Sequence, residues 1–131
     1  MSDSAPEPVL TPVGVARTPY ETPEDAPHQG FADDEEATIE VFEAFAGALS
    51  GIDDVIRVTV VYWADRADRD SLADEAGVGA FAKRTPHRPN PLNVCTCTLL
   101  GRESRRLRVR GLDAVDGSPV VDLKPALQAE R

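Results

Sequence analysis

Apolar residues along this chain fall mostly into short runs that suit strands. Residues 55–63 are apolar nearly throughout, which predicts a central strand that is buried on both faces. Further alternating or apolar runs, bounded by Gly, Pro and Asp, predict more strands. These lie at residues 12–17, 77–84, 91–101, 105–110 and 119–123, with a turn at Asp116-Gly117 before the last.

One segment has the period of a helix instead. Its apolar residues recur at steps of three and four: Ile39, Phe42, Phe45, Ala46 and Leu49. Acidic residues before this segment suit a helix start, and Gly51 suits its end. The pattern predicts one packed α-helix over about residues 34–50. The fold class is therefore mainly β with one helix, which fits a small barrel or a sandwich.

The length of 131 residues fits one domain with a core of its own. We expect a flexible tail over residues 1–9 and a single folded domain over residues 10–131. Apolar runs are too short to cross a membrane, and the N-terminus does not resemble a signal peptide, so a cytoplasmic protein is expected. We therefore expect Cys95 and Cys97 to be reduced thiols on a strand. C-x-C alone does not predict a metal site.

Charge is distributed unevenly along the chain. The net charge of −9 would by itself argue against a nucleic-acid partner. Residues 83–110, however, hold eight basic residues and a single acid, Glu103. This basic segment follows a strongly acidic first half, so the local charge leaves an anionic partner open.

The basic segment begins with a stiff stretch, KRTPHRPNPLNV. Pro86, Pro89 and Pro91 fix their own φ angles and hold the preceding residues extended. The polar side chains between them are therefore arranged before a ligand arrives, which lowers the cost of ordering on binding. A rigid crossover with incidental charges is the other interpretation. His28 and His87 lie in loops, where a lone histidine is more often solvated than catalytic.

Four segments in this order resemble one known family: PVGVARTPYETPEDAPHQG, LSGIDDVIRVTVVYWADR, GAFAKRTPHRPNPLNVCTCTLL and GLDAVDGSPVVDLKP. Together they are similar to the TrmO (YaeB-like, TsaA-like) family of S-adenosylmethionine-dependent tRNA methyltransferases. The resemblance covers about residues 11–126. Its specific parts are R-T-P-H-R-P-N-P at residues 84–91 and D-G-S-P-V-V-D-L-K-P at residues 116–125.

The resemblance implies a small antiparallel β-barrel rather than a Rossmann fold. It also implies a homodimer that binds S-adenosyl-L-methionine near the subunit boundary. The implied reaction is methylation of the exocyclic N6 of threonylcarbamoyl-adenosine next to the anticodon of tRNA. The cofactor-binding positions that match are Pro27, His28, Gln29, Ala64, Asp65, Arg84, Arg88, Asn90, Val94, Asp113, Ala114, Val115, Asp116 and Gly117.

The chain departs from the family pattern at three points. Family members commonly have an aromatic residue and a His at the positions of Ala64 and Asp65, a Gly at Asn93, and a Tyr at Ala126. These differences motivate one alternative, a paralogue that binds S-adenosylmethionine without acting on tRNA. The acidic surface motivates another, a small-molecule methyltransferase.

Roles in catalysis and RNA binding follow from the chemistry of the implied reaction. Methyl transfer needs an in-line arrangement, and removing a proton from the acceptor nitrogen would help. His87 and Asp113 are the hypothesised bases. Phosphate contacts are expected from basic residues of the segment: Lys83, Arg84, Arg88, Arg102, Arg105, Arg106 and Arg108.

Overall fold

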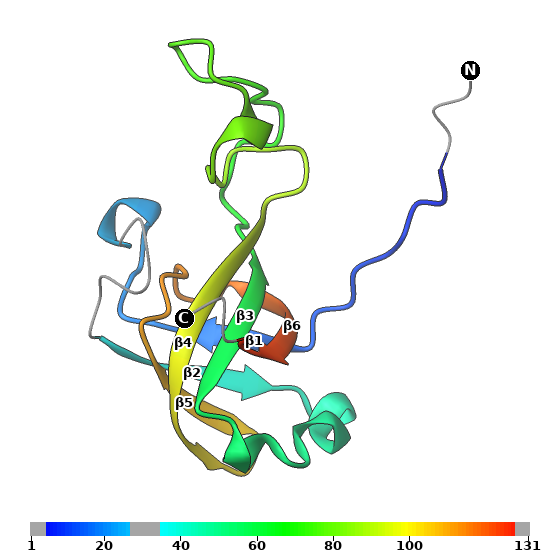
Figure 1. The fold of residues 1–131 in the computed structure, drawn as a ribbon, viewed down its shortest axis with the longest axis vertical. Coiled ribbons are helices and arrows are strands. Elements are labelled where there is room, and N and C mark those ends of the chain that lie inside the picture. Colours follow the sequence, from blue (N-terminus) through cyan, green and yellow to red (C-terminus); the bar gives the residue numbers. More distant parts are fainter. Residues whose placement is uncertain (1–4, 27–34, 128–131) are drawn as a thin grey trace.

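The computed structural model describes residues 5–26 and 35–127 of the chain. Its strands are β1 (Gly14–Arg17), β2 (Glu36–Val41), β3 (Arg57–Trp63), β4 (Leu92–Glu103), β5 (Arg106–Arg110) and β6 (Pro119–Pro125). They form a closed barrel in the order β1-β2-β5-β4-β3-β6, and every neighbouring pair is antiparallel. Figure 1 shows this barrel with the long β3–β4 connection projecting beyond it. The predicted small antiparallel barrel is thus confirmed.

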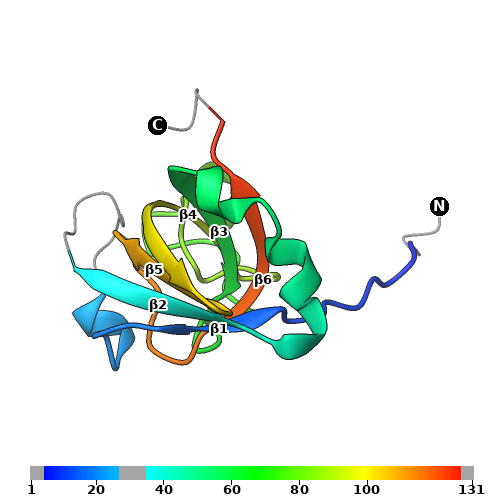
Figure 2. The ribbon, with the colours of Figure 1, turned by 90° about the horizontal axis from the view of Figure 1, so that it is seen from below.

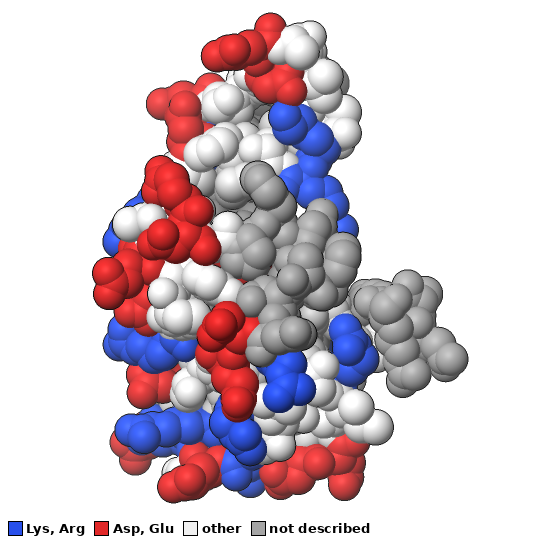
Figure 3. All heavy atoms as spheres, turned by 90° about the vertical axis from the view of Figure 1, so that its left-hand side faces the viewer, with Lys and Arg blue, Asp and Glu red and all other residues white. Residues whose placement is uncertain are grey.

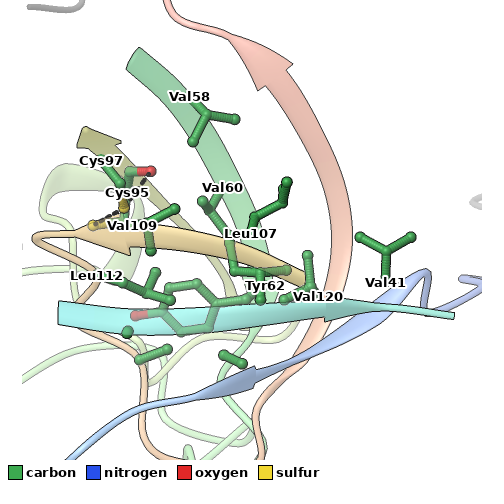
Figure 4. Close-up of a cluster of buried hydrophobic side chains, with 14 of the residues drawn as sticks. Val41, Val58, Val60, Tyr62, Cys95, Cys97, Leu107, Val109, Leu112 and Val120 are labelled. Carbon is green, nitrogen blue, oxygen red and sulfur yellow. Dashed lines mark hydrogen bonds between the residues drawn. The ribbon is translucent and has the colours of Figure 1, made fainter. Parts of the chain in front are cut away.

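The barrel interior is filled by one alternating set of side chains from each strand (Figure 4). On β3 these are Val58, Val60 and Tyr62, which are at most 4% exposed. Leu107 and Val109 of β5 are fully buried opposite them. The two-residue period seen in the sequence therefore corresponds to a core that runs the length of the barrel.

The predicted helix over residues 34–50 is corrected by the structure. Residues 36–41 form strand β2, and only Glu43–Leu49 coil, as the 3-10 helix η3. The apolar residues Ala37, Ile39 and Val41 alternate, so the first half also fits a strand, and pairing with β1 and β5 selects it. The helical period arose because a strand residue, Ile39, lies at helical spacing from the residues of η3.

The β3–β4 connection holds a second correction. The predicted strand over residues 77–84 is a turn at Gly77, whose φ is 84°, followed by the 3-10 helix η5 (Ala80–Ala82). A single isolated bridge, Ala73 to Gly79, is the only pairing that the connection makes in the described residues. The connection projects past the barrel (Figure 1), so no neighbouring strand is available to pair with it. Short 3-10 helices η1 (Pro23–Asp25) and η4 (Ile52–Asp54) complete the elements.

Antiparallel pairing gives the barrel two distinct ends, and Figure 2 shows the molecule from below the view of Figure 1. We call "loop end" the end where β3 finishes, β4 starts and the β5–β6 loop (residues 111–118) lies. We call "hairpin end" the opposite end, where β4 turns into β5 and η3 packs. No helix among the described residues is long and apolar enough to cross a membrane. The predicted division into a tail and one domain stays a prediction.

Candidate functional site

The proline segment, residues 83–91, is fixed to the loop end by backbone hydrogen bonds. The Ala64 N–H, just after β3, donates to the Pro91 carbonyl at 2.8 Å. Inside the connection, the Arg88 guanidinium donates to the carbonyls of Ala80 at 2.6 Å and Thr85 at 3.3 Å. The Thr85 carbonyl thereby gains a hydrogen bond, and the Ala80 carbonyl gains one in addition to that from the Lys83 N–H. Arg88 therefore holds the segment in shape, in addition to any contact with a ligand.

His87 lies exposed on this segment, and its ring has a defined hydrogen bond. Nδ1 accepts from the backbone N–H of Asp68 at 2.9 Å. A neutral imidazole that accepts at Nδ1 carries its proton on Nε2. In this arrangement His87 can donate a hydrogen bond from Nε2, but it cannot take up a proton there.

A buried polar network connects Asp113 to the barrel interior. The Tyr62 hydroxyl donates to Oδ1 of Asp113 at 2.7 Å and accepts from Nδ2 of Asn93 at 3.2 Å. Burial, and next to it the negative charge of Asp113, raises the pKa of Tyr62 far above its ordinary value. Tyr62 therefore stays a neutral donor that orients the Asp113 carboxylate.

Sequence reasoning missed Tyr62, although a signal for it was present. Tyr62 lies on the same face of β3 as Val58 and Val60, so its ring enters the core and its hydroxyl lies at the loop end. A buried tyrosine hydroxyl usually has a partner. Asn93, noted only as a departure from the family pattern, supplies the second one.

The β5–β6 loop is tied to the end of β1. The Thr18 side chain donates to the Ala114 carbonyl at 2.7 Å, and its backbone N–H donates to Oδ1 of Asp116 at 3.1 Å. The Asp116 N–H donates to the Tyr20 carbonyl at 2.6 Å. Gly117 has a φ of 87°, which favours glycine at the predicted turn. This loop is consequently a fixed wall at the loop end.

The structure gathers the described part of the predicted cofactor site at the loop end. Ala64 and Asp65 follow β3, Asn90 precedes β4, and residues 113–117 form the fixed loop beside them. Val94 lies on the outer face of β4 and is 48% exposed. Pro27, His28 and Gln29 lie outside the described residues. Arg84 is exposed and makes no hydrogen bond or ion pair with the residues that the structure describes.

The basic residues predicted to bind RNA divide between the two ends. Lys83 lies at the loop end, where its ammonium pairs with Asp74 at 2.7 Å; this bond lowers the pKa of Asp74. The other predicted arginines start at Arg102, near the far end of β4, which has twelve residues. At about 3.3 Å per residue, that strand is about 36 Å long. The segment that is continuous in sequence is therefore not one surface.

Three of the four predicted arginines at the end of β4 and on β5 are paired with carboxylates, and the fourth, Arg105, is bound to a carbonyl. Arg106 lies 3.8 Å from Glu40, Arg108 lies 3.2 Å from Glu36, and Arg102 lies 3.4 Å from Asp53. Arg105 donates to the Val41 carbonyl at 2.9 Å. Figure 3 shows basic and acidic side chains interspersed over this part of the surface.

The two cysteines are buried free thiols in the barrel wall. Their sulfur atoms lie 3.9 Å apart, and Cys95 donates to the Gly111 carbonyl at 3.2 Å. The hydrogen bond to Cys95 and burial raise the pKa of Cys97. Both side chains are at most 5% exposed and pack in the core, as the strand interpretation predicted.

Comparison with known proteins places the chain among S-adenosylmethionine-related proteins. The profile of the tRNA-methyltransferase O N-terminal domain matches residues 15–129. A "Probable S-adenosyl-L-methionine-binding protein" of Halobacterium salinarum is 48% identical over 120 residues, covering 89% of this chain and 97% of that protein. One of Archaeoglobus fulgidus is 47% identical over 121 residues, covering 88% of this chain but 33% of the relative.

A solved structure agrees with the fold. The crystal structure of TrmO from Pseudomonas aeruginosa superposes with a TM-score of 0.80 at 31% identity. The match covers 94% of this chain and 57% of the TrmO chain. The chain thus spans about the whole length of one archaeal relative, a third of another, and just over half of the bacterial protein.

Proposed function

Because the chain belongs to the tRNA-methyltransferase O family, we propose that it is an S-adenosyl-L-methionine-dependent methyltransferase that modifies tRNA. The proposed acceptor is the exocyclic N6 of threonylcarbamoyl-adenosine next to the anticodon. One observation supports this most directly. The proline segment and the β5–β6 loop, which carry the two family motifs, meet at one end of the barrel around Tyr62 and Asp113.

The residues at the loop end fit the proposed cofactor chemically. The cofactor is a cation with an adenine ring, and it needs both carboxylate and apolar contacts. Asp113 offers a carboxylate held by Tyr62, Asn90 an exposed amide, and Val94 a half-exposed apolar surface. Because Val94 faces outward from the barrel, a ligand touching both Val94 and Asp113 would lie across the rim of the loop end.

The chemistry requires the acceptor nitrogen to face the methyl group in line. Bound S-adenosyl-L-methionine supplies that activated methyl group. The residues of this chain must orient the acceptor and remove its proton. Of the two hypothesised bases, Asp113 is favoured, because the hydrogen bond from Tyr62 holds its carboxylate in one orientation at the loop end. His87 is favoured as a hydrogen-bond donor, because its Nδ1 already accepts from Asp68.

We also propose that the chain forms a homodimer through the outer face of the barrel near the loop end. Leu92 and Val94 of β4 are 36% and 48% exposed on this face. Large apolar side chains of this kind next to a ligand site suit a subunit boundary. Sedimentation would measure the assembly, and a monomer at all protein concentrations would contradict it.

RNA phosphates are proposed to contact the loop end rather than the hairpin end. Arg84 makes no ion pair within the described residues, and Arg88 spends its hydrogen bonds on neutral carbonyls. Both keep an uncompensated positive charge. Arg102 and Arg106 at the hairpin end are paired with carboxylates, so we expect smaller contributions from them.

The test is methyl transfer to tRNA that carries threonylcarbamoyl-adenosine, followed by mass spectrometry of its nucleosides. We expect a methylated product, and Asp113→Asn should lower turnover about 100-fold or more. Arg106→Ala, at the hairpin end, is the matched control and should retain turnover. Cofactor binding by calorimetry without any methylated nucleoside would overturn the tRNA reaction and favour a binding protein.

A further inference from the structure

A groove of about 410 Å³ lies beside the loop end, and it shares only Asn90 with the described residues proposed to contact the cofactor. Trp63, at the end of β3, and Arg69, in the β3–β4 connection, line it together with Asn90 of the proline segment. Residues Pro8 and Leu10, which precede β1, also line it. The groove thus joins the N-terminal segment to the proline segment.

Two flat groups in this groove are held in a fixed arrangement. The guanidinium carbon of Arg69 lies 5.0 Å from the centroid of the Trp63 ring. The Arg69 Nε also donates to the Pro89 carbonyl at 2.8 Å, which ties the guanidinium to the proline segment. A side chain held both by an aromatic face and by a backbone carbonyl is ordered in advance. The groove therefore presents preformed planar surfaces.

The remaining lining suits a flat, polar-edged ligand. Asn90 is exposed and brings an amide that can both donate and accept hydrogen bonds. Pro119, Val121 and Leu10 supply apolar surface. Planar stacking surfaces, an amide and apolar walls are the groups by which proteins hold unstacked nucleobases.

Charge favours RNA as the source of that base. Arg69 makes no ion pair with a carboxylate among the residues that the structure describes, so its positive charge is available to a phosphate. The carboxylate proposed to contact the cofactor, Asp113, is not among the residues that line the groove.

We infer that this groove binds an unstacked base of the RNA substrate, next to the nucleotide that is modified. The inference rests on the proposed function, and it assigns a role to Trp63 and Arg69 that the family resemblance did not. Base–aromatic stacking tolerates any base, because every base has a flat face. The groove would therefore position the RNA, while recognition of the modified nucleoside remains with the loop end.

The chain contains a single tryptophan, so its fluorescence reports on this groove alone. The probe is an RNA stem-loop with an unpaired loop, compared with the same stem-loop lacking the loop bases. We expect saturable quenching by the first and none by the second. Arg69→Ala should weaken the binding seen by fluorescence about tenfold. Arg66→Ala is the matched control: Arg66 lies in the same connection, donates to the Glu21 carbonyl and does not line the groove.

A deletion of residues 1–10 gives an independent variant, since the described part of this segment is exposed and removing it leaves the barrel core intact. It should weaken quenching by the stem-loop without lowering the melting temperature. The inference is overturned if the stem-loop is retained on filters while tryptophan fluorescence is unchanged. Saturable quenching by S-adenosyl-L-methionine alone would assign the groove to the cofactor. Quenching that depends on protein concentration without RNA would assign it to a second copy.

Methyl transfer measured on the same variants separates this inference from the proposed function. If RNA quenches the tryptophan but no methylated nucleoside forms, the groove is supported and the proposed methyltransferase activity is contradicted. If Arg69→Ala transfers methyl groups with an unchanged KM for tRNA, the activity is supported and the role of the groove is contradicted.

Discussion

Arginines at the two ends of the barrel have different partners. At the hairpin end Arg102 and Arg106 face carboxylates, whereas at the loop end Arg69 and Arg88 donate to backbone carbonyls. A carbonyl acceptor orients the guanidinium without cancelling its charge. Residues that look equivalent in the sequence therefore differ in what they can offer a ligand. Arg69 and Arg88 therefore keep their positive charge in a fixed place at the loop end, whereas Arg102 and Arg106 are compensated. Each end also has an exception, because Lys83 pairs with Asp74 and Arg105 donates to the Val41 carbonyl.

The largest expected effect concerns the buried network of the loop end. Tyr62→Phe removes the donor to Asp113 and leaves the Asn93 amide without its acceptor. We expect a loss of about 1–3 kcal/mol in the free energy of unfolding. Urea unfolding would measure it.

Tyr20→Phe is the matched control for that substitution. The Tyr20 hydroxyl is buried but has no hydrogen-bond partner among the described residues. Its removal should leave stability unchanged or slightly raised. Equal losses for the two variants would mean that packing of the rings, and not the Asp113 bond, is responsible.

Arg88→Ala tests whether carbonyl-bound arginines organise the proposed cofactor site. The substitution removes the guanidinium bonds to the carbonyls of Ala80 and Thr85 and so loosens the proline segment. Calorimetry with S-adenosyl-L-methionine should give affinity about tenfold weaker, which is about 1.4 kcal/mol. Arg106→Ala, whose side chain is 72% exposed, should stay near the parent value. An unchanged affinity in Arg88→Ala would mean that the carbonyl-bound arginine does not organise the cofactor site.

Alkaline pH should lower the free energy of unfolding through the Tyr62 hydroxyl at the loop end. The pKa of Tyr62 is raised in the fold, so its contribution is fully present below pH about 10, the ordinary tyrosine value. Above that pH the unfolded chain loses the proton that the folded chain keeps, so stability falls as pH rises. The limiting slope for one proton is about 1.4 kcal/mol per pH unit. Melting temperatures between pH 8 and about 11 should fall less steeply in Tyr62→Phe.

The smallest effect belongs to an exposed pair on the wall between β2 and β5. Arg108→Ala removes a pair with Glu36 whose side chains are 58% and 49% exposed. We expect a loss of about 0–1 kcal/mol that shrinks in high salt. A double-mutant cycle with Glu36→Ala isolates the pair. A coupling that persists in high salt would mean that this wall is stabilised by more than screened charges.

The strands were predictable because burial inside a closed barrel enforces the two-residue period. Leu107 and Val109 alternate with arginines that point outward, and this pattern can be read without coordinates. The first half of the predicted helix was not recoverable in this way. Ile39 satisfies both periods, and only pairing with β1 and β5 decides between them.

The site was predictable where a motif fixes the backbone, and less predictable where two interacting residues are far apart in the sequence. Prolines and Gly117 constrain their own neighbourhoods, so the proline segment and the turn appeared where expected. The bond between Tyr62 and Asp113 joins residues 51 positions apart. The pairing of Arg108 with Glu36 joins residues 72 positions apart. No local pattern could reveal either one.

The closure of the barrel also governs how this protein can associate with itself. An open sheet exposes a row of backbone donors and acceptors at its edge, where another chain can add a strand. Here β1 pairs with both β2 and β6, so the ring of strands leaves no such template. The proposed contact between copies would then pass through side chains such as Val94. A charged substitution there should abolish the proposed assembly and leave the fold intact.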